Sequence, residues 1–149
     1  MSAKLEAIWL KRKRRGPMDP AATVRTLARS GLAGNVHQGG RRQVTLLSAE
    51  AWQEAEQELG RSLHPTLRRA NLMVSGIDLE QSRGRMLAIG QVQILIRGET
   101  KPCNQMEEAR TGLRRTLSVG WRGGVYGEVL TDGDLTVGDR VRWVDVSRS

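Results

Sequence analysis

Hydrophobic residues in this chain recur mainly at every second position, in short runs that glycines and polar residues separate. In residues 4–10, Leu5, Ala7 and Trp9 share one face, and residues 91–96 alternate in the same way. A period of two is typical of a β-strand with one buried face. The other segments that fit a strand are residues 43–47, 71–75, 85–89, 125–130, 135–137 and 141–146.

Helical periodicity is confined to a few short segments. Residues 49–59 place Trp52 and Ala55 on one face, where packing residues are expected. Ser48 is a suitable N-cap for this helix, and Gly60 is a suitable residue to end it. Shorter helical stretches are expected at residues 65–69, 105–109 and 112–117, and residues 24–28 fit either a strand or one helical turn.

Glycine and proline mark the connections between these segments. Gly16-Pro17 and Asp19-Pro20 predict a loop, and the four glycines within residues 31–40 predict tight backbone bends. Asp132-Gly133 is typical of a hairpin turn. About eight short strands with few helices indicate a mainly β fold, a small β-barrel with helical insertions. We expect residues 1–149 to form a single domain.

The composition agrees with a folded protein of the cytoplasm. A length of 149 residues suits one core, and 38% apolar with 27% charged residues favours folding over disorder. One cysteine cannot form an internal disulfide, which is compatible with a reducing compartment. No apolar run reaches the length of a membrane span, and the first ten residues lack the apolar core of a signal peptide. We therefore expect a cytoplasmic protein without a membrane partner.

The net charge of +8 favours anionic partners. Much of the excess lies in residues 11–15, an unbroken run of Lys and Arg. Such a run is typical of a solvated turn between two strands, and it is also compatible with a nucleic-acid-binding surface. Aromatic residues that would stack on bases are missing beside it, which disfavours nucleic acid as the partner.

Cys103 is the residue with the most reactive side chain. It ends the segment Gly-Glu-Thr-Lys-Pro-Cys, residues 98–103, directly after a predicted strand. Lys101 stands two residues before it, and Arg69 or Arg122 could approach it in space; positive neighbours favour the thiolate, the nucleophilic and metal-binding form. The alternative is a small buried hydrophobic residue. The preceding Pro and the polar residues that follow favour a functional loop.

Two kinds of cysteine chemistry have little support in the residue spacing. A zinc site is disfavoured because there is one Cys and because His37 and His64 lack ligand spacing. A Cys-His hydrolase with Cys103 as nucleophile and His37 as base remains open, although no local signature accompanies it.

Several segments together resemble the MOSC domain, the type found at the C-terminus of molybdenum cofactor sulfurases. The similar segments are residues 98–103, 31–37, 42–46, 69–72, 122–125 and 137–141. They follow the family order over roughly residues 5 to 146, which makes the resemblance more specific than a single motif. It points to the small stand-alone bacterial members, the group that contains the hydroxylaminopurine-resistance protein.

The resemblance implies a barrel of the pyruvate-kinase-barrel-like type and a cysteine that ligates molybdenum or carries sulfur. That role falls on Cys103. Arg69 and Asn71 match an Arg-x-Asn element expected to line the pocket of the cofactor, molybdopterin. Since Arg binds phosphate well, Arg42 and Arg122 are further candidate contacts, together with Lys101. The family is also associated with pyridoxal phosphate.

The resemblance further implies reduction of N-hydroxylated small molecules with a separate reductase, since the chain shows no flavin, haem or iron–sulfur motif. We expect the isolated protein to lack the cofactor. A second hypothesis is a sulfur carrier that holds a persulfide on Cys103 and meets a sulfurtransferase. A third is a non-enzymatic nucleic-acid-binding barrel that uses residues 11–15. Asn35 stands where the family usually has Asp, so an acid–base role at that position would be lost.

Overall fold

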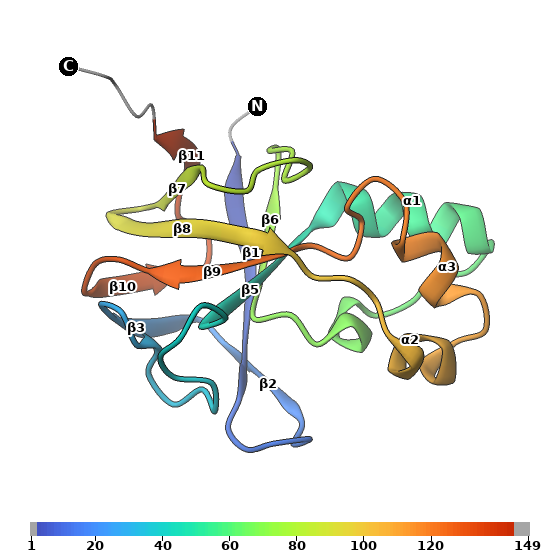
Figure 1. The fold of residues 1–149 in the computed structure, drawn as a ribbon, viewed down its shortest axis with the longest axis horizontal. Helices are drawn as coiled ribbons and strands as arrows, with labels where there is room; N and C mark the ends of the chain where they lie inside the picture. Colours follow the sequence, from blue (N-terminus) through green and yellow to red (C-terminus); the bar gives the residue numbers. More distant parts are fainter. Residues whose placement is uncertain (1–2, 145–149) are drawn as a thin grey trace.

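The computed structural model describes residues 3–144 and is mainly β (Figure 1). Eight strands form one sheet in the order β11-β7-β8-β9-β5-β6-β1-β2, and β10-β3-β4 form a second, smaller sheet. The strands are β1 (Lys4–Lys11), β2 (Met18–Ala21), β3 (Thr23–Leu27), β4 (Gly31–Leu32), β5 (Val44–Ser48), β6 (Leu72–Ser75), β7 (Met86–Ile89), β8 (Val92–Glu99), β9 (Val125–Val129), β10 (Gly133–Thr136) and β11 (Val141–Val144). The prediction of a mainly β fold is confirmed.

The large sheet curls without closing into a continuous barrel. Within residues 3–144, β1 and β11 share no ladder. An isolated bridge joins Lys4 to Arg140, and the Leu5 amide donates to the Asp139 carbonyl at 2.8 Å. The amide of Val141 also donates to the carbonyl of Ala3, at 3.0 Å. The expected barrel is therefore matched only loosely, by a sheet whose two sides are held together at one end.

The helices gather at one end of the sheet (Figure 1). They are α1 (Ala49–Leu59), the 3₁₀ turn η1 (Pro65–Arg68), α2 (Asn104–Ala109) and α3 (Leu113–Leu117). Ser48 caps α1 by accepting a hydrogen bond from the Ala51 amide, and Gly60 ends it in the left-handed conformation, as predicted. Trp52, Met106 and Leu113 pack between these helices and form a small apolar cluster separate from the main core. None of the helices between residues 3 and 144 is long and apolar enough to cross a membrane.

The main core lies inside the curled sheet. Alternate residues of β8, Val92, Ile94 and Ile96, are fully buried there, which explains the period of two seen in the sequence. Leu46 of β5 and Leu72 of β6 join the same cluster.

Two expectations for local structure were wrong, and two others were left open by the sequence or by the range of described residues. Asp19-Pro20 does not lie in a loop but in β2, where Pro20 pairs with Trp9 on an edge strand that tolerates a missing amide donor. Asp132-Gly133 does not connect a paired hairpin, because β10 pairs with β3 instead of β9. Residues 24–28 are largely strand β3, and the last predicted strand reaches residues 145 and 146, which lie outside the described residues.

Candidate functional site

The one parallel strand pair of the described structure brings basic residues together at one edge of the sheet. Strands β5 and β6 run parallel, with Leu46 opposite Leu72. The residues that lead into two parallel strands lie at the same edge, so Arg42 before β5 and Arg69 before β6 converge. Arg69 itself ends η1 in the left-handed conformation, with φ 62°. Arg42 lies over the ring of Tyr126, with its Cζ atom 5.6 Å from the ring centroid.

A small polar cavity, here called the inner cavity, lies at this edge and has a volume of about 50 Å³. Its lining residues are Lys11, His37, Arg42, Gln43, Val44, Thr45, Arg69 and Asn71. An adjoining hollow of about 20 Å³ shares Arg42, Thr45 and Arg69 with it. That hollow is also lined by Arg68, Thr100 and Gly123, which lie next to the loop of Cys103.

A chain of side-chain amides forms the floor of the inner cavity. The Asn71 Oδ1 atom accepts from the amide of Thr45 at 3.2 Å, while Asn71 Nδ2 donates to the Trp9 carbonyl and to Asn35 Oδ1, each at 3.1 Å. Asn35 Oδ1 also accepts from the amide of Lys11 at 2.9 Å. These partners fix the orientation of both amides, because a flipped amide would place donor against donor. Asn35 Nδ2 is buried and has no acceptor among the described residues.

A wider hollow, here called the outer groove, opens beside the inner cavity and has a volume of about 500 Å³. Its lining residues are Lys11, Arg14, Arg15, His37, Arg69, Gln105 and Glu108. The turn between β1 and β2 forms one wall of this groove. Arg69 holds the turn in place, because its Nη2 atom donates to the carbonyl of Gly16 at 2.6 Å. Gln105 and Glu108 of α2 line the groove as well, so it reaches the helix that Cys103 precedes.

The site carries an excess of positive charge. Burial and the positive charges of Arg69, Arg42 and Arg14 lower the pKa of Lys11. Burial, followed by Lys11, Arg42 and Arg14, likewise lowers the pKa of His37. Among the described residues that line the two hollows, Glu108 is the one carboxylate. The cations therefore repel one another, and an anion in the cleft would relieve this repulsion.

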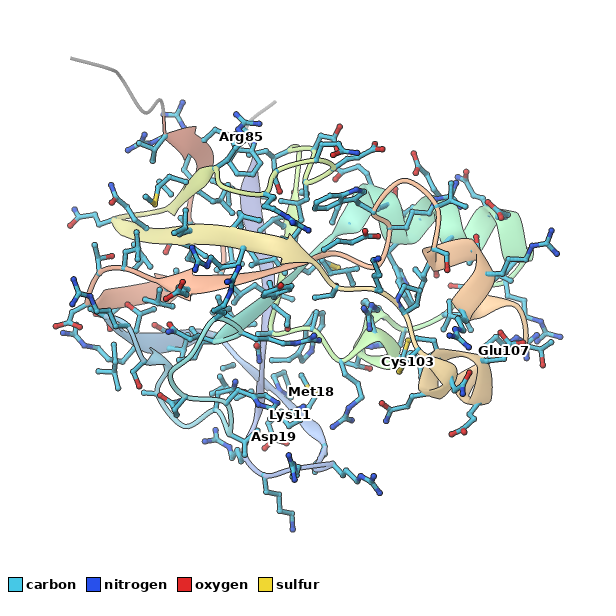
Figure 2. All side chains as sticks on the ribbon, viewed as in Figure 1. Lys11, Met18, Asp19, Arg85, Cys103 and Glu107 are labelled. Atoms are coloured by element: carbon cyan, nitrogen blue, oxygen red, sulfur yellow. The ribbon has the colours of Figure 1, made fainter. Side chains whose placement is uncertain are left out.

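Cys103 lies where the chain leaves the long strand β8 and enters α2, and its side chain is exposed (Figure 2). The loop before it is tightly held. Arg68 donates from Nη2 to the Thr100 carbonyl at 2.9 Å and from Nε to the Gly123 carbonyl at 2.8 Å. The Thr100 hydroxyl donates to the same Gly123 carbonyl at 2.6 Å, and the Thr100 amide donates to the carbonyl of Gly124 at 2.9 Å.

Arg68 is a largely buried cation beside the cysteine. Burial is the largest effect on its pKa, followed by the charge of Arg42, and together they lower the pKa of Arg68 to about 10. The negative charge of a Cys103 thiolate acts in the opposite direction. The guanidinium of Arg68 therefore lies near enough to the Cys103 sulfur for the two side chains to interact electrostatically.

The structure brings part of the predicted set together. Arg42, Arg69 and Asn71 all line the inner cavity. Lys101 is exposed and lines none of the hollows described above. His37 lines the inner cavity and the outer groove, whereas Cys103 is not among the residues that line them. Residues 3–144 contain no group of three or more His, Cys, Asp or Glu side chains placed to hold a metal ion.

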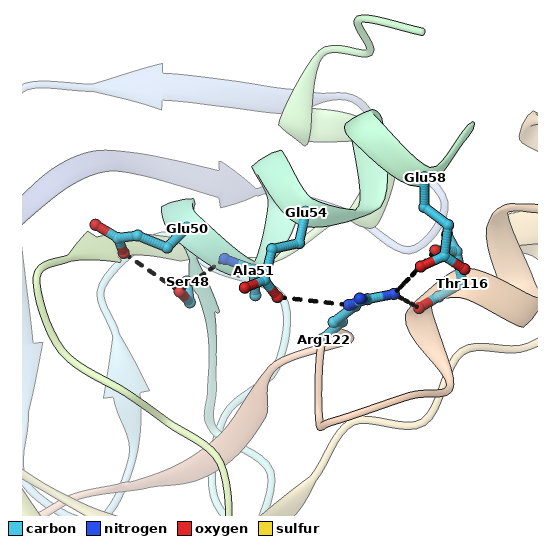
Figure 3. Close-up of polar contacts among 7 residues, drawn as sticks. All are labelled: Ser48, Glu50, Ala51, Glu54, Glu58, Thr116 and Arg122. Carbon is cyan, nitrogen blue, oxygen red and sulfur yellow. Dashed lines mark hydrogen bonds and ion pairs between the residues drawn. The ribbon is translucent and has the colours of Figure 1, made fainter. Parts of the chain in front are cut away.

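Arg122 lies apart from the cleft. Its guanidinium faces α1, where Nη1 donates to Glu58 at 2.6 Å and Nε lies 3.6 Å from Glu54 (Figure 3). Nη1 also donates to the carbonyl of Thr116 at 3.1 Å. These contacts give Arg122 a structural role, tying the segment before β9 to α1 and α3.

Several residues of the cleft were not assigned to a cofactor site from the sequence. The run that contains Lys11, Arg14 and Arg15 was interpreted as a solvated turn or, alternatively, as a nucleic-acid-binding surface, and Arg68 was not considered. The basic run does connect two strands, but its side chains diverge: Arg12 pairs with Asp19 at 3.2 Å, whereas Lys11, Arg14 and Arg15 line the groove. A run of cations without interspersed acids is the available signal, and only the fold shows which of them share a hollow.

Comparisons with known proteins agree with this geometry. The family model of the MOSC domain matches residues 33–142. The crystal structure of the YuaD protein from Bacillus subtilis superposes with a TM-score of 0.80 at 21% identity, covering 95% of this chain and 94% of that one. The YiiM structures from Geobacillus stearothermophilus and Escherichia coli give TM-scores of 0.73 and 0.72, each at 14% identity. They cover 96% and 98% of this chain, and 75% and 72% of their own.

At these identities the structural likenesses establish the fold alone. No curated protein matches the sequence significantly. The family model spans most of the chain and includes the Arg69–Asn71 segment, the Cys103 loop and the inner-cavity residues after Gly31. The chain belongs to the MOSC domain family.

Proposed function

We propose that this MOSC domain binds a phosphorylated molybdenum cofactor in the basic cleft, with the Cys103 sulfur as protein ligand to the metal. The observation that carries the proposal is a cationic hollow, poor in carboxylates, that extends from Arg42 and Arg69 to the loop of Cys103. MOSC membership supports the choice of cofactor.

The residues present fit such a group. Arg42, Arg69 and Lys11 all line the inner cavity and offer donors to a phosphate. A thiolate is a soft ligand suited to a metal–sulfur centre, and the exposed Cys103 lies beside the buried cation Arg68. Hydrogen bonds of Arg68 and Thr100 to the carbonyls of Thr100 and Gly123 hold the loop that leads to Cys103.

The reaction we propose is the two-electron reduction of an N-hydroxylated small molecule. The N–OH group takes up two electrons and two protons, the N–O bond breaks, and the products are an N–H group and water. The cofactor would supply the electron exchange when bound. A separate reductase would supply the electrons. The protein would hold the phosphate through Arg42 and Arg69, position the sulfur through Arg68, and keep the cleft positive.

The test is metal analysis of protein made in a host that synthesises the cofactor and receives ample molybdenum. Protein isolated without this provision is expected to lack the cofactor, whereas in this host we expect molybdenum in the wild type, little in Cys103→Ser, and reduced loading in Arg42→Gln. Arg61→Gln, which removes an exposed arginine outside the cleft, is the matched control and should load like the wild type. Equal molybdenum in the wild type and Cys103→Ser would remove the ligand assignment.

A second function is favoured by the exposure of Cys103. Sulfur transfer requires a thiolate that a donor protein can reach, and Cys103 is exposed with no side-chain hydrogen bond capping α2. In this proposal Cys103 holds a persulfide and passes its outer sulfur to an acceptor thiolate, while the Cys103 thiolate leaves. Mass spectrometry of protein purified without reductant should then show one added sulfur on the Cys103 peptide, and a consistently unmodified thiol would contradict it.

A further inference from the structure

The turn that carries the basic run forms one wall of the outer groove, and hydrogen bonds hold its backbone in place. Gly16 is buried, its carbonyl accepts from Arg69, and its amide donates to the Lys13 carbonyl at 2.9 Å. Arg15 has φ 59°, a left-handed conformation that the turn maintains. These contacts hold the backbone of the turn, so the Cα atoms of Arg14 and Arg15 have defined positions beside the groove.

The two hollows differ in size in a way that suits two parts of one ligand. A volume of about 50 Å³ admits a small polar group such as one tetrahedral oxyanion. The outer groove, at about 500 Å³, has the size of a ligand-binding cleft. Lys11, His37 and Arg69 line both hollows. These side chains could therefore contact an anion in the inner cavity and another in the outer groove.

The charges favour an anion in each hollow. Arg42 faces only the inner cavity, while Arg14 and Arg15 face only the outer groove. Burial is the largest cause of the lowered pKa of Lys11, followed by the charges of Arg69, Arg42 and Arg14, so cations from both hollows act on this ammonium group. One phosphate in the inner cavity would leave Arg14 and Arg15 without a partner among the described lining residues except for Glu108.

We propose that the outer groove is a second phosphoryl subsite and that the natural ligand of this cleft carries two linked phosphoryl groups, as nucleoside diphosphates and dinucleotides do. The inner phosphoryl group lies against Arg42 and Arg69, and the outer one lies against Arg14 and Arg15. Lys11, with three donors on one ammonium group, bonds to both. The inference deepens the proposed function, on which it rests for the remainder of the ligand.

The experiment uses pyrophosphate and orthophosphate with the full chain free of metal, and it follows backbone amide shifts and affinity by NMR titration. We expect pyrophosphate to bind about tenfold more tightly than orthophosphate, a difference of about 1.4 kcal/mol. Orthophosphate should shift the amide of Thr45 in the inner cavity, and pyrophosphate should shift those of Thr45 and Gly16 together. Because no molybdenum is present, this result is independent of metal loading.

The discriminating variant is Arg14→Gln/Arg15→Asn, in which Asn tolerates the left-handed conformation of residue 15. It should lose the preference for pyrophosphate while keeping the affinity for orthophosphate. Lys13→Gln/Arg83→Gln removes the same charge from exposed residues that line neither hollow and should keep the preference. Equal affinities of the wild type for the two anions would overturn the proposal. An equal loss of the preference for pyrophosphate in the two double variants would overturn it as well, because it would show that the preference reflects only the overall positive charge.

Discussion

Asn71 donates from Nδ2 to Oδ1 of Asn35 at 3.1 Å, while the Nδ2 of Asn35 is buried without an acceptor among the described residues. At position 35, the hydrogen bonds use only the acceptor oxygen of the side chain, and an aspartate would supply that oxygen equally well. An aspartate would also add a negative charge next to Lys11, whose amide donates to the same Oδ1. By having Asn there, this chain keeps its cleft without an internal counter-charge.

Asn35→Asp should therefore raise the pKa of His37, which burial and neighbouring cations hold below its ordinary value of 6.5. The fold should persist, because both hydrogen bonds to Oδ1 remain possible. NMR titration of the His37 ring measures the change. Gln91→Glu adds the same charge at an exposed residue outside the cleft and should leave His37 unchanged. An identical His37 pKa in the wild type and Asn35→Asp would contradict the electrostatic account.

Removal of the Arg68 guanidinium should destabilise the protein and slow the reactions of its cysteine. Arg68→Met leaves the carbonyls of Thr100 and Gly123 without this donor, at an expected cost of about 2–4 kcal/mol in free energy of unfolding. Denaturant unfolding measures this loss. At a fixed pH, alkylation of Cys103 should also be slower, because a neighbouring cation is gone. Arg68→Lys should restore part of the alkylation rate; a rate as slow as that of Arg68→Met would contradict a role for the charge.

Gly124 and Gly138 form a matched pair that separates backbone conformation from steric clash. Their φ angles are 97° and 99°, so alanine is strained at both positions. A Cβ atom at Gly124 would overlap the Leu46 carbonyl, whereas nothing lies within 4 Å at Gly138. Gly138→Ala should cost about 1–2 kcal/mol, and Gly124→Ala should cost at least about 3 kcal/mol or prevent folding. Similar thermal unfolding midpoints for the two variants would contradict this prediction, because they would show that β5 and β9 move apart at Gly124 without a large cost.

Arg122→Met should affect stability and leave molybdenum loading unchanged. The hydrogen bond from Arg122 lowers the pKa of Glu58 below its ordinary value of 4.5. A carboxylate with a lowered pKa stabilises the fold above about pH 4.5, and this stabilisation is lost as the pH falls through the lowered pKa. The midpoint of thermal unfolding should therefore fall at neutral pH, and by less in acid. Arg61→Met is the control, and loss of molybdenum in Arg122→Met alone would restore Arg122 as a candidate cofactor contact.

Local signals in the sequence predicted the elements that local interactions determine. Helix α1 begins after Ser48 and ends before Gly60, as expected, because both caps act within a few residues. The Asp132-Gly133 turn was predicted wrongly as a hairpin, because the partner of β10 is β3, more than a hundred residues away. Strand pairing at that distance depends on the whole sheet and cannot be read from a dipeptide.

The sequence predicted those residues of the site that lie in a segment resembling a known motif. Arg69 and Asn71 were singled out by resemblance, and the structure places both at the inner cavity. Lys11 reaches the same cavity from a segment outside the matching motifs, and His37 reaches it from a matching segment that was not assigned to the pocket. Their association depends on the antiparallel pairing of β1 with β6 and on the buried amides of Asn35 and Asn71, which are properties of the fold.

The parallel pairing of β5 with β6 has a consequence for the order of folding. Its two strands are separated by a crossover that contains α1 and η1, so the pair is expected to form later than the antiparallel hairpin of β7 and β8. Arg42 and Arg69 come together only when that pair exists. An anion bound between them would stabilise the native state more than the transition state, so we expect phosphate to slow unfolding and to leave the refolding rate nearly unchanged.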